Sequence, residues 1–199
     1  SLGEFTDLDG RPRGTDENKP GEMVVLGRNF AIGDEPGIRY EPNNNDVAEI
    51  LAVVENASKL ADFSIVTIHT HQNGGSREIP PDFLPEFARS VIDAGADVFV
   101  GHGPHVLQGI EIYKGKPILY SLGDFIFQNE TLSRLAPDNY ESYQLDELAQ
   151  VSDFNAARYQ NDTVGFPSIP EIWEAVIAVP TFTNLELTEL ALYPIDLGY

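Results

Sequence analysis

The sequence contains no cysteine, few cations and no long apolar run. Without cysteine the protein cannot form a disulfide framework, a thiolate zinc site or a cysteine nucleophile. No apolar stretch approaches the roughly 20 residues that a membrane-spanning helix needs, so we expect no membrane span. Disulfide-rich, thiol-dependent and membrane-spanning classes of protein are therefore excluded.

Positive charge is scarce. The 199 residues carry 12 Lys and Arg against 32 Asp and Glu, which gives a formal net charge of −20 and a pI near 4.3. Non-specific binding to nucleic acid depends on cationic contacts to phosphate, so we expect no nucleic-acid partner. Most of this surface would also repel an anionic polymer or a phosphorylated substrate. Binding such a molecule requires a local cationic element such as a metal ion.

The composition fits one folded domain that follows a polar lead. With 42% hydrophobic residues the chain can build its own core. Residues 1–21 mix Gly, Pro and both signs of charge without apolar periodicity, which predicts a flexible lead. Residues 22–199 form the predicted domain, and the apolar run at 23–32 predicts its first strand.

The first half of this domain predicts alternating helices and strands. Apolar residues recur at helical spacing over 46–61, where Asp46 fits the position of a helix cap, and again over 82–94. The mostly apolar runs at 63–69 and 97–102 follow these helices and are typical of strands buried on both faces. The order helix, strand, helix, strand indicates an α/β fold.

The second half favours antiparallel sheet. In residues 109–123, two short apolar runs lie on either side of Lys114-Gly115-Lys116. In residues 173–195, two longer apolar runs lie on either side of Thr183-Asn184. Each arrangement predicts a β-hairpin. Residues 128–170 between them are polar and weakly periodic. They predict a long excursion with a short helix, and a loop of that length is usually functional or mobile.

The four histidines of the chain lie at the ends of the two predicted buried strands. His69 and His71 end the first strand, and His102 and His105 follow the second. Ligands of open α/β sheets bind beyond the carboxyl ends of the strands, so the two pairs converge if the strands are parallel neighbours. Neutral imidazole is a preferred ligand of zinc, manganese and iron, which predicts a metal or catalytic site. The alternative, which applies most to His71, is an exposed or hydrogen-bonded residue without a ligand.

Two more residues are candidates for substrate binding. Arg77, in the loop after the first strand, could hold a phosphoryl or carboxyl group with its forked guanidinium, and the alternative is a surface ion pair with Glu78. Asp124 ends another predicted strand. It fits a carboxylate at the mouth of the site and a turn or capping aspartate equally well.

Two stretches of the sequence resemble a known family. SIVTIHTHQNGG at residues 64–75, and the stretch from ARSVIDAGADVFVGHGPHVLQGIE to YSLGDFIFQNE at residues 88–130, are similar to the bacterial capsule-synthesis or poly-γ-glutamate-biosynthesis (CapA-like) proteins. The resemblance implies a fold similar to the calcineurin-like metallophosphoesterases. The α/β chain would then form part of an αββα sandwich, with antiparallel hairpins in its C-terminal half.

The resemblance also implies roles for the histidines. His69 corresponds to the family's strand-end histidine, and His102 and His105 correspond to the pair in its Gly-His-x-Pro-His loop. With His71, they are the expected ligands of divalent metal ions, manganese, zinc or iron. His69 and His105 are the expected catalytic residues of a phosphoesterase-type hydrolase, in which the metal activates a water molecule.

The sequence departs from the family pattern in ways that predict a partner segment or a partner chain. Thr70-His71 replaces the family's Trp-Gly, and Asp124 replaces the asparagine of Ser-Leu-Gly-Asn. The Gly-Asp and Asn-Asn-His motifs that would supply further ligands are not found before His69. We therefore expect the C-terminal portion of a longer protein, completed by an N-terminal segment or by a second chain in a homo-oligomer.

The same resemblance sets the expected substrate and place of action. The substrate would be a phosphoester or an anionic polymer, and the protein would act outside the cell or in the cell envelope. The alternative function is a non-catalytic envelope component that binds or exports an anionic polymer.

Overall fold

A computed structural model describes most of the chain: residues 22–25, 28–31, 38, 40–128, 131–146 and 148–198. The chain divides into two compact units, residues 1–39 and residues 40–199. The flexible lead predicted for residues 1–21 lies outside the described residues.

The first unit contains a short antiparallel hairpin. Strand β1 (Glu22–Val25) pairs with strand β2 (Arg28–Ala31), so the chain reverses direction within the run where one strand was predicted. The prediction of a single strand at 23–32 was wrong. A glycine in the middle of that run is a turn signal, and it outweighs the apolar residues on either side.

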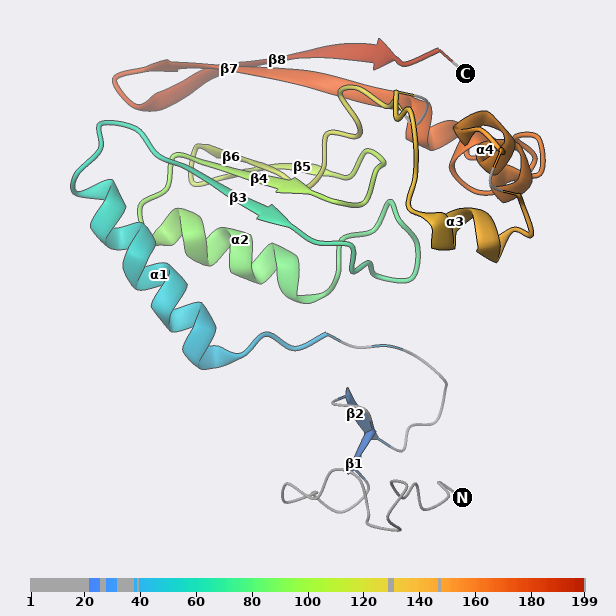
Figure 1. The fold of residues 1–199 in the computed structure, drawn as a ribbon. Helices are drawn as coiled ribbons and strands as arrows, with labels where there is room; N and C mark the ends of the chain where they lie inside the picture. Colours follow the sequence, from blue (N-terminus) through green and yellow to red (C-terminus); the bar gives the residue numbers. More distant parts are fainter. Residues whose placement is uncertain are drawn as a thin grey trace. The chain divides into compact units, whose positions relative to one another are not determined.

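The second unit has three layers (Figure 1). Its central sheet has the strand order β3-β4-β6-β5, in which β3, β4 and β6 are parallel and β5 is antiparallel to β6. Helices α1 and α2 lie on one face of this sheet, and the β7–β8 hairpin crosses the other face. The fold is therefore mixed α/β with a small mixed sheet and an antiparallel hairpin. The helices and strands have the following bounds: α1 Asn44–Ser58, β3 Ile65–His69, α2 Phe83–Asp93, β4 Val98–His102, β5 Ile110–Tyr113, β6 Lys116–Leu119, α3 Pro137–Ser142, α4 Val151–Tyr159, β7 Glu174–Thr183 and β8 Glu186–Asp196.

The first helix begins earlier than predicted. The side chain of Asn43 accepts a hydrogen bond from the backbone N–H of Asn45 at 2.9 Å, which caps the helix. Asp46, the predicted cap, instead lies in the first turn, where its negative charge interacts favourably with the helix dipole. Helix α2 begins after Asp82, as predicted.

The core lies between the sheet and the two helices. Apolar side chains from one face of each helix pack against the central strands and exclude water. The buried members of this cluster are Val54, Leu84, Ala88, Val91, Ile92, Ala96, Phe99, Ile118 and Tyr120. Within the described part of the chain, no helix has both the length and the apolar character that crossing a membrane requires.

Strand β3 differs from its prediction. Ile65, Thr67 and His69 are exposed, and only the alternate residues Val66 and Ile68 pack against the core. The strand forms one edge of the sheet, so its burial on both faces was wrongly predicted. A mostly apolar run is also compatible with an edge strand whose outer face is uncovered.

Both predicted C-terminal hairpins are present. The first joins β5 to β6 through Lys114 and Gly115, whose φ angles are 50° and 74°. The second joins β7 to β8 through Asn184 and Leu185, with φ angles of 52° and 66°, one residue later than predicted. Two consecutive positive φ angles are typical of a type I′ turn, whose twist matches that of a hairpin.

The excursion at residues 128–170 contains more helix than expected. Helices α3 and α4 are followed by two short 3₁₀ turns, the first at Phe166–Ser168. Phe154 and Tyr159 of α4 are buried, so this segment has a small core of its own. Figure 1 shows α3 and α4 beyond the carboxyl ends of β3 and β4, next to the predicted site.

Candidate functional site

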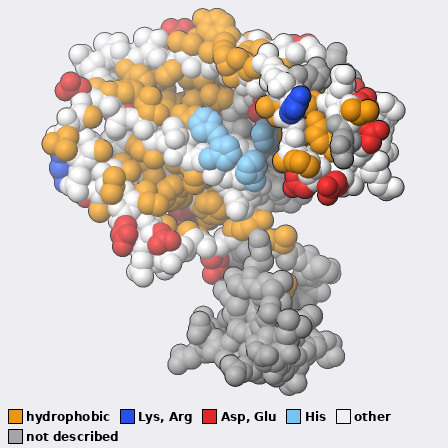
Figure 2. Space-filling model, in the orientation of Figure 1, with side chains coloured by type: hydrophobic (Ala, Val, Ile, Leu, Met, Phe, Trp, Pro, Cys, Tyr) orange, Lys and Arg blue, Asp and Glu red, His pale blue; other side chains and the backbone are white. Residues whose placement is uncertain are grey.

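The parallel strands place two histidines side by side. His69 ends β3, His102 ends β4, and the two residues are register partners. Side chains of paired residues on neighbouring strands point to the same face of a sheet, here the face opposite the helices. The prediction that these strands are parallel neighbours is confirmed. In Figure 2 the histidine side chains gather in one place on the visible face.

A glycine allows the loops that follow β3 and β4, here called the histidine loops, to approach each other closely. The backbone N–H of Thr70 donates a hydrogen bond to the carbonyl of His102 at 2.8 Å. Gly103 faces this contact with a φ of +114°, and a Cβ atom at this position would overlap the carbonyl oxygen of Thr70. The spacing between the histidine loops therefore depends on a residue without a side chain.

The structure brings three of the four histidines together. The Nε2 atoms of His69 and His71 are 3.1 Å apart, and the ring centroids of His71 and His105 are 5.6 Å apart. His102 is exposed, and among the described contacts its ring makes none with the other three. The nearest histidine group is therefore His69, His71 and His105, with His102 beside it on the neighbouring strand.

Asp124 orients His105. Its Oδ1 lies 3.0 Å from Nδ1 of His105, and the side chain is 17% exposed. A carboxylate in this position fixes a histidine tautomer with a proton on Nδ1 and leaves Nε2 to act on a ligand. His105 itself has a φ of 63°, a left-handed conformation that is uncommon outside glycine and is enriched at functional sites.

A second carboxylate oxygen is unsatisfied at the same place. Oδ2 of Asp124 is buried and has no hydrogen-bond partner among the described residues. Burying an unpaired anionic oxygen is costly, so such an atom calls for an explanation. Of the two interpretations given to Asp124, the structure favours a carboxylate at the site, since its side chain contacts a site histidine.

An aromatic wall closes one side of the histidine group. The ring of Phe166 lies 5.1 Å from that of His105 and 5.7 Å from that of Phe127, and Phe127 contacts Trp173 at 5.4 Å. Sequence reasoning missed Phe166, because it lies in the weakly periodic excursion and belongs to no motif. Its position depends on tertiary packing alone.

Arg77 and Gln108 lie next to this wall. The guanidinium carbon of Arg77 is 5.0 Å from the centroid of the Phe166 ring. The side-chain amide of Gln108 donates a hydrogen bond to the backbone carbonyl of Arg77 at 2.6 Å. Sequence reasoning also missed Gln108, although it follows the second histidine pair by only a few positions.

The donors at this site suit a divalent metal, but they form an incomplete set. No group of three or more histidine, aspartate or glutamate side chains within the described ranges is arranged so that it could hold one ion. Imidazole nitrogens and a carboxylate are nevertheless the donor types that zinc, manganese and iron prefer. The same atoms can also act without a metal, as hydrogen-bond and proton-transfer groups.

Comparison with known proteins assigns the family. A family model described as "Bacterial capsule synthesis protein PGA_cap" matches residues 12–129, a range that includes all four histidines, Arg77 and Asp124. The chain belongs to this family. The resemblance drawn from the sequence motifs is thereby confirmed, and it associates the chain with bacterial capsule synthesis.

Individual relatives extend beyond the length of this chain. An uncharacterized protein of Sinorhizobium fredii is 42% identical over 188 residues, which is 89% of this chain and 40% of that protein. The PGA biosynthesis protein CapA of Bacillus subtilis is 35% identical over 123 residues, which covers 62% of this chain and 27% of the relative. A probable polyglutamine synthesis accessory protein of Mycobacterium tuberculosis is 42% identical over 96 residues, which covers 47% of this chain and 25% of the relative's length. The chain thus spans less than half the length of these relatives.

Proposed function

We propose that the histidine group binds a divalent metal ion, manganese, zinc or iron, and that the protein is a phosphoesterase-type hydrolase in the synthesis of capsule or poly-γ-glutamate. The observation that supports this proposal most directly is the meeting of His69, His71, His105 and Asp124 at the carboxyl ends of parallel strands. The layering of helices, sheet and hairpin is compatible with part of a calcineurin-like αββα sandwich. Family membership supports the setting, capsule synthesis.

The geometry of the closest pair fits a shared ion. Two imidazole nitrogens that each lie about 2.0–2.1 Å from a tetrahedral ion are separated by about 3.3 Å. The Nε2 atoms of His69 and His71 are 3.1 Å apart. Asp124, whose Oδ2 is buried and has no partner among the described residues, supplies a further anionic oxygen on the His105 side of the histidine group. A hydrogen bond between two neutral histidines explains the nitrogen spacing equally well, and the titration described below separates the two explanations.

The residues of the chain would divide the work as follows. His69 and His71 hold the ion, which when bound supplies an activated water molecule and a positive charge for the reacting oxygen. In its protonated form His105, held at Nδ1 by Asp124, would carry a second proton on Nε2 and give that proton to the leaving group. The aromatic wall that contains Phe166 excludes water from one side of His105.

Further ligands have to come from outside the described residues. Strand β3 is an open edge, and the groove between it and α1 exposes Ile50, Val53 and Ile65 by 44%, 67% and 59%. Exposed strand edges recruit other strands. We propose that an N-terminal segment of the same protein, or a second copy of it, pairs here and brings its own ligands beside His69. The site would then lie in an extracellular or cell-envelope protein that acts on an anionic polymer or phosphoester.

A second candidate function is a non-catalytic envelope component that binds or helps export an anionic polymer. The observation that favours it is the lack of a complete ligand set among the described residues. Turnover of an aryl phosphate with added manganese or zinc supports the hydrolase. Retention of poly-γ-glutamate that persists in the presence of a chelator supports the polymer binder.

Metal titration tests the proposed function. We expect the chain to bind manganese or zinc in a calorimetric titration, and His69→Ala to abolish the binding because it removes one of the two closest nitrogens. Thr67→Ala is the matched control, since this exposed residue lies on the same strand and face as His69 but has no imidazole nitrogen, and we expect it to bind metal as the parent chain does. Equal metal binding by the parent chain and His69→Ala would refute the proposed ligand pair. Metal binding should also weaken on acidification, because protons compete for each imidazole nitrogen.

A further inference from the structure

Arg77 contacts Phe166, the ring that packs against His105, and it has no acidic partner among the described residues. In this strongly acidic protein Arg89, Lys114 and Lys116 each form an ion pair with a carboxylate. Arg77 forms none with the residues that the structure describes. Its neighbour Glu78 interacts mainly with Ser76, whose hydrogen bond is the largest of the influences that lower the pKa of Glu78. The surface ion pair considered as the alternative for Arg77 is therefore not formed.

Two contacts hold Arg77 in place. The guanidinium packs at 5.0 Å from the ring centroid of Phe166, and that ring packs against His105 at 5.1 Å. The backbone of Arg77 accepts a 2.6 Å hydrogen bond from Gln108, whose side chain is buried. Phe166 thus contacts both Arg77 and His105, the proposed proton donor. Gln108 holds the backbone of the loop that carries Arg77.

Among the described residues the guanidinium of Arg77 forms no hydrogen bond or ion pair, so its N–H donors remain available. An arginine that packs against an aromatic ring uses the face of its planar group, while its N–H donors point outward in that plane. These donors match two oxygens of a phosphoryl or carboxyl group in a bidentate arrangement. With a net charge of −20 the protein needs a local cation to receive such a group, and Arg77 is a cation held against the ring that also contacts His105.

We propose that Arg77, positioned by Phe166 and Gln108, is the anion-recognition residue of this site and holds a phosphoryl or carboxyl group of the substrate beside His105. The inference rests on the proposed function for the identity of the reacting site. It adds that the substrate presents an oxyanion to the arginine while its reacting group faces the histidines. Phe166 and Gln108 are positioning residues that act through Arg77.

The test measures anion binding without metal or turnover. The chain is titrated in chelator with inorganic phosphate in one arm and glutarate in the other, and the ring-proton NMR signals of the four histidines report binding. We expect the His105 signals to shift in the parent chain. Arg77→Gln should weaken probe binding at least tenfold, and Arg77→Lys should retain part of it because the charge remains but the fork is lost. Tighter binding of phosphate indicates a phosphoester substrate, and tighter binding of glutarate indicates a carboxylate polymer.

Arg158→Gln is the matched control. Arg158 of α4 also packs against aromatic rings, those of Phe154 and Tyr159, so its loss removes the same kind of contact at another place. We expect it to bind both probes within twofold of the parent. Equal probe binding by Arg77→Gln and the parent, or an equal loss in Arg158→Gln, overturns the inference. Probe binding that depends on Arg77 in a chain without metal affinity upholds the anion site and refutes the metal-dependent hydrolase.

Discussion

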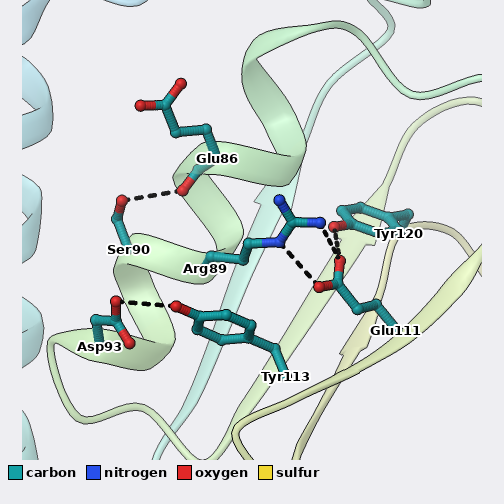
Figure 3. A network of polar contacts seen from close by, with 7 residues as sticks. All are labelled: Glu86, Arg89, Ser90, Asp93, Glu111, Tyr113 and Tyr120. Carbon is teal, nitrogen blue, oxygen red and sulfur yellow. Dashed lines mark hydrogen bonds and ion pairs between the residues drawn. The ribbon is translucent and has the colours of Figure 1, made fainter.

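Two polar clusters beside the same sheet differ in how completely their carboxylates are hydrogen-bonded. At the β5 edge, Glu111 accepts two hydrogen bonds from Arg89, at 2.8 and 3.1 Å, and one from the hydroxyl of Tyr120 at 2.7 Å (Figure 3). At the carboxyl ends of β3 and β4, one oxygen of Asp124 contacts His105, and the other has no hydrogen-bond partner in the part of the chain that the structure describes. Both oxygens of Glu111 therefore accept hydrogen bonds from the protein, whereas one oxygen of Asp124 retains its capacity to accept one.

The difference separates a structural cluster from a site that can bind. The hydrogen bonds from the Arg89 guanidinium hold the pKa of Glu111 below its ordinary value, so the charged form is already stabilised inside the protein. Asp124 and Arg77 instead retain unused hydrogen-bonding capacity in a part of the fold built from close backbone contacts. Functional sites often retain such capacity at the expense of stability.

Gly103→Ala should show the largest effect on stability. The residue has a φ of +114°, and a Cβ atom would overlap the Thr70 backbone, so the histidine loops would have to move apart. We expect a loss of about 3 kcal/mol in the free energy of unfolding, from strain and steric overlap together. Urea denaturation measures this loss.

Gly109→Ala is the control for this substitution. Apart from Gly109 itself and its two chain neighbours, no described residue has a heavy atom within 4 Å of a Cβ placed at Gly109, so we expect a change within about 0.5 kcal/mol. Similar effects of the two substitutions would show that close backbone approach at Gly103 does not hold the histidine loops.

Tyr120→Phe should show an intermediate effect that depends on pH. At neutral pH the variant loses the hydroxyl bond to Glu111, and we expect a cost of about 1 kcal/mol. Burial, with the hydrogen bond to Glu111 as the second cause, raises the pKa of Tyr120 above its ordinary value. The folded state therefore binds more protons than the unfolded state above roughly pH 10, where an unfolded tyrosine ionises.

This difference sets the direction of the pH dependence. The contribution of Tyr120 to stability is complete below roughly pH 10 and is lost as the pH rises further. The stability gap between parent and Tyr120→Phe should thus begin to narrow near roughly pH 10 in denaturant titrations and continue to narrow as the pH rises further. Tyr193→Phe is the control for the loss of a tyrosine hydroxyl at an exposed position, where we expect the free energy of unfolding at neutral pH to change by no more than about 0.5 kcal/mol. A constant gap for Tyr120→Phe would contradict the raised pKa.

The two clusters also differ in how far the sequence predicts them. Periodicity predicts α2, β4 and both C-terminal hairpins, and strand-end placement predicts that His69 and His102 lie side by side, since each depends on local spacing. The exposure of β3 is not predictable from an apolar run, because it depends on which strands are neighbours. Phe166 packs against His105 from a segment of weak periodicity, so no local pattern could identify it.

The start of the first helix is a second feature that local sequence does not determine. Asn43 and Asp46 are both residue types that cap helices, and only the backbone conformation distinguishes them. Single-sequence patterns therefore locate elements and strand ends well. Partners across the fold, such as Arg77 with Phe166, emerge only from tertiary packing.

Asp124→Asn should have the smallest effect on stability and still impair the site. Asparagine keeps the oxygen that accepts from Nδ1 of His105 and replaces the buried, unpartnered anionic oxygen with a neutral amide. Since a neutral group costs less to bury than an anion, we expect the free energy of unfolding to stay within about 0.5 kcal/mol of the parent or to rise. Metal affinity should fall by about 10–100-fold, because the variant removes the anionic oxygen that is proposed as a further donor at the site.

Glu111→Gln is the matched substitution in the saturated cluster. Its amide nitrogen would face a donor of Arg89 or Tyr120, so we expect a loss of about 1–2 kcal/mol, moderated by the half-exposed position of Arg89. Metal affinity should remain that of the parent. Thermal unfolding and metal titration of the two variants side by side measure both quantities. If Asp124→Asn destabilised the protein as much as Glu111→Gln and left metal affinity unchanged, Asp124 would be a structural carboxylate and the contrast between the clusters would disappear.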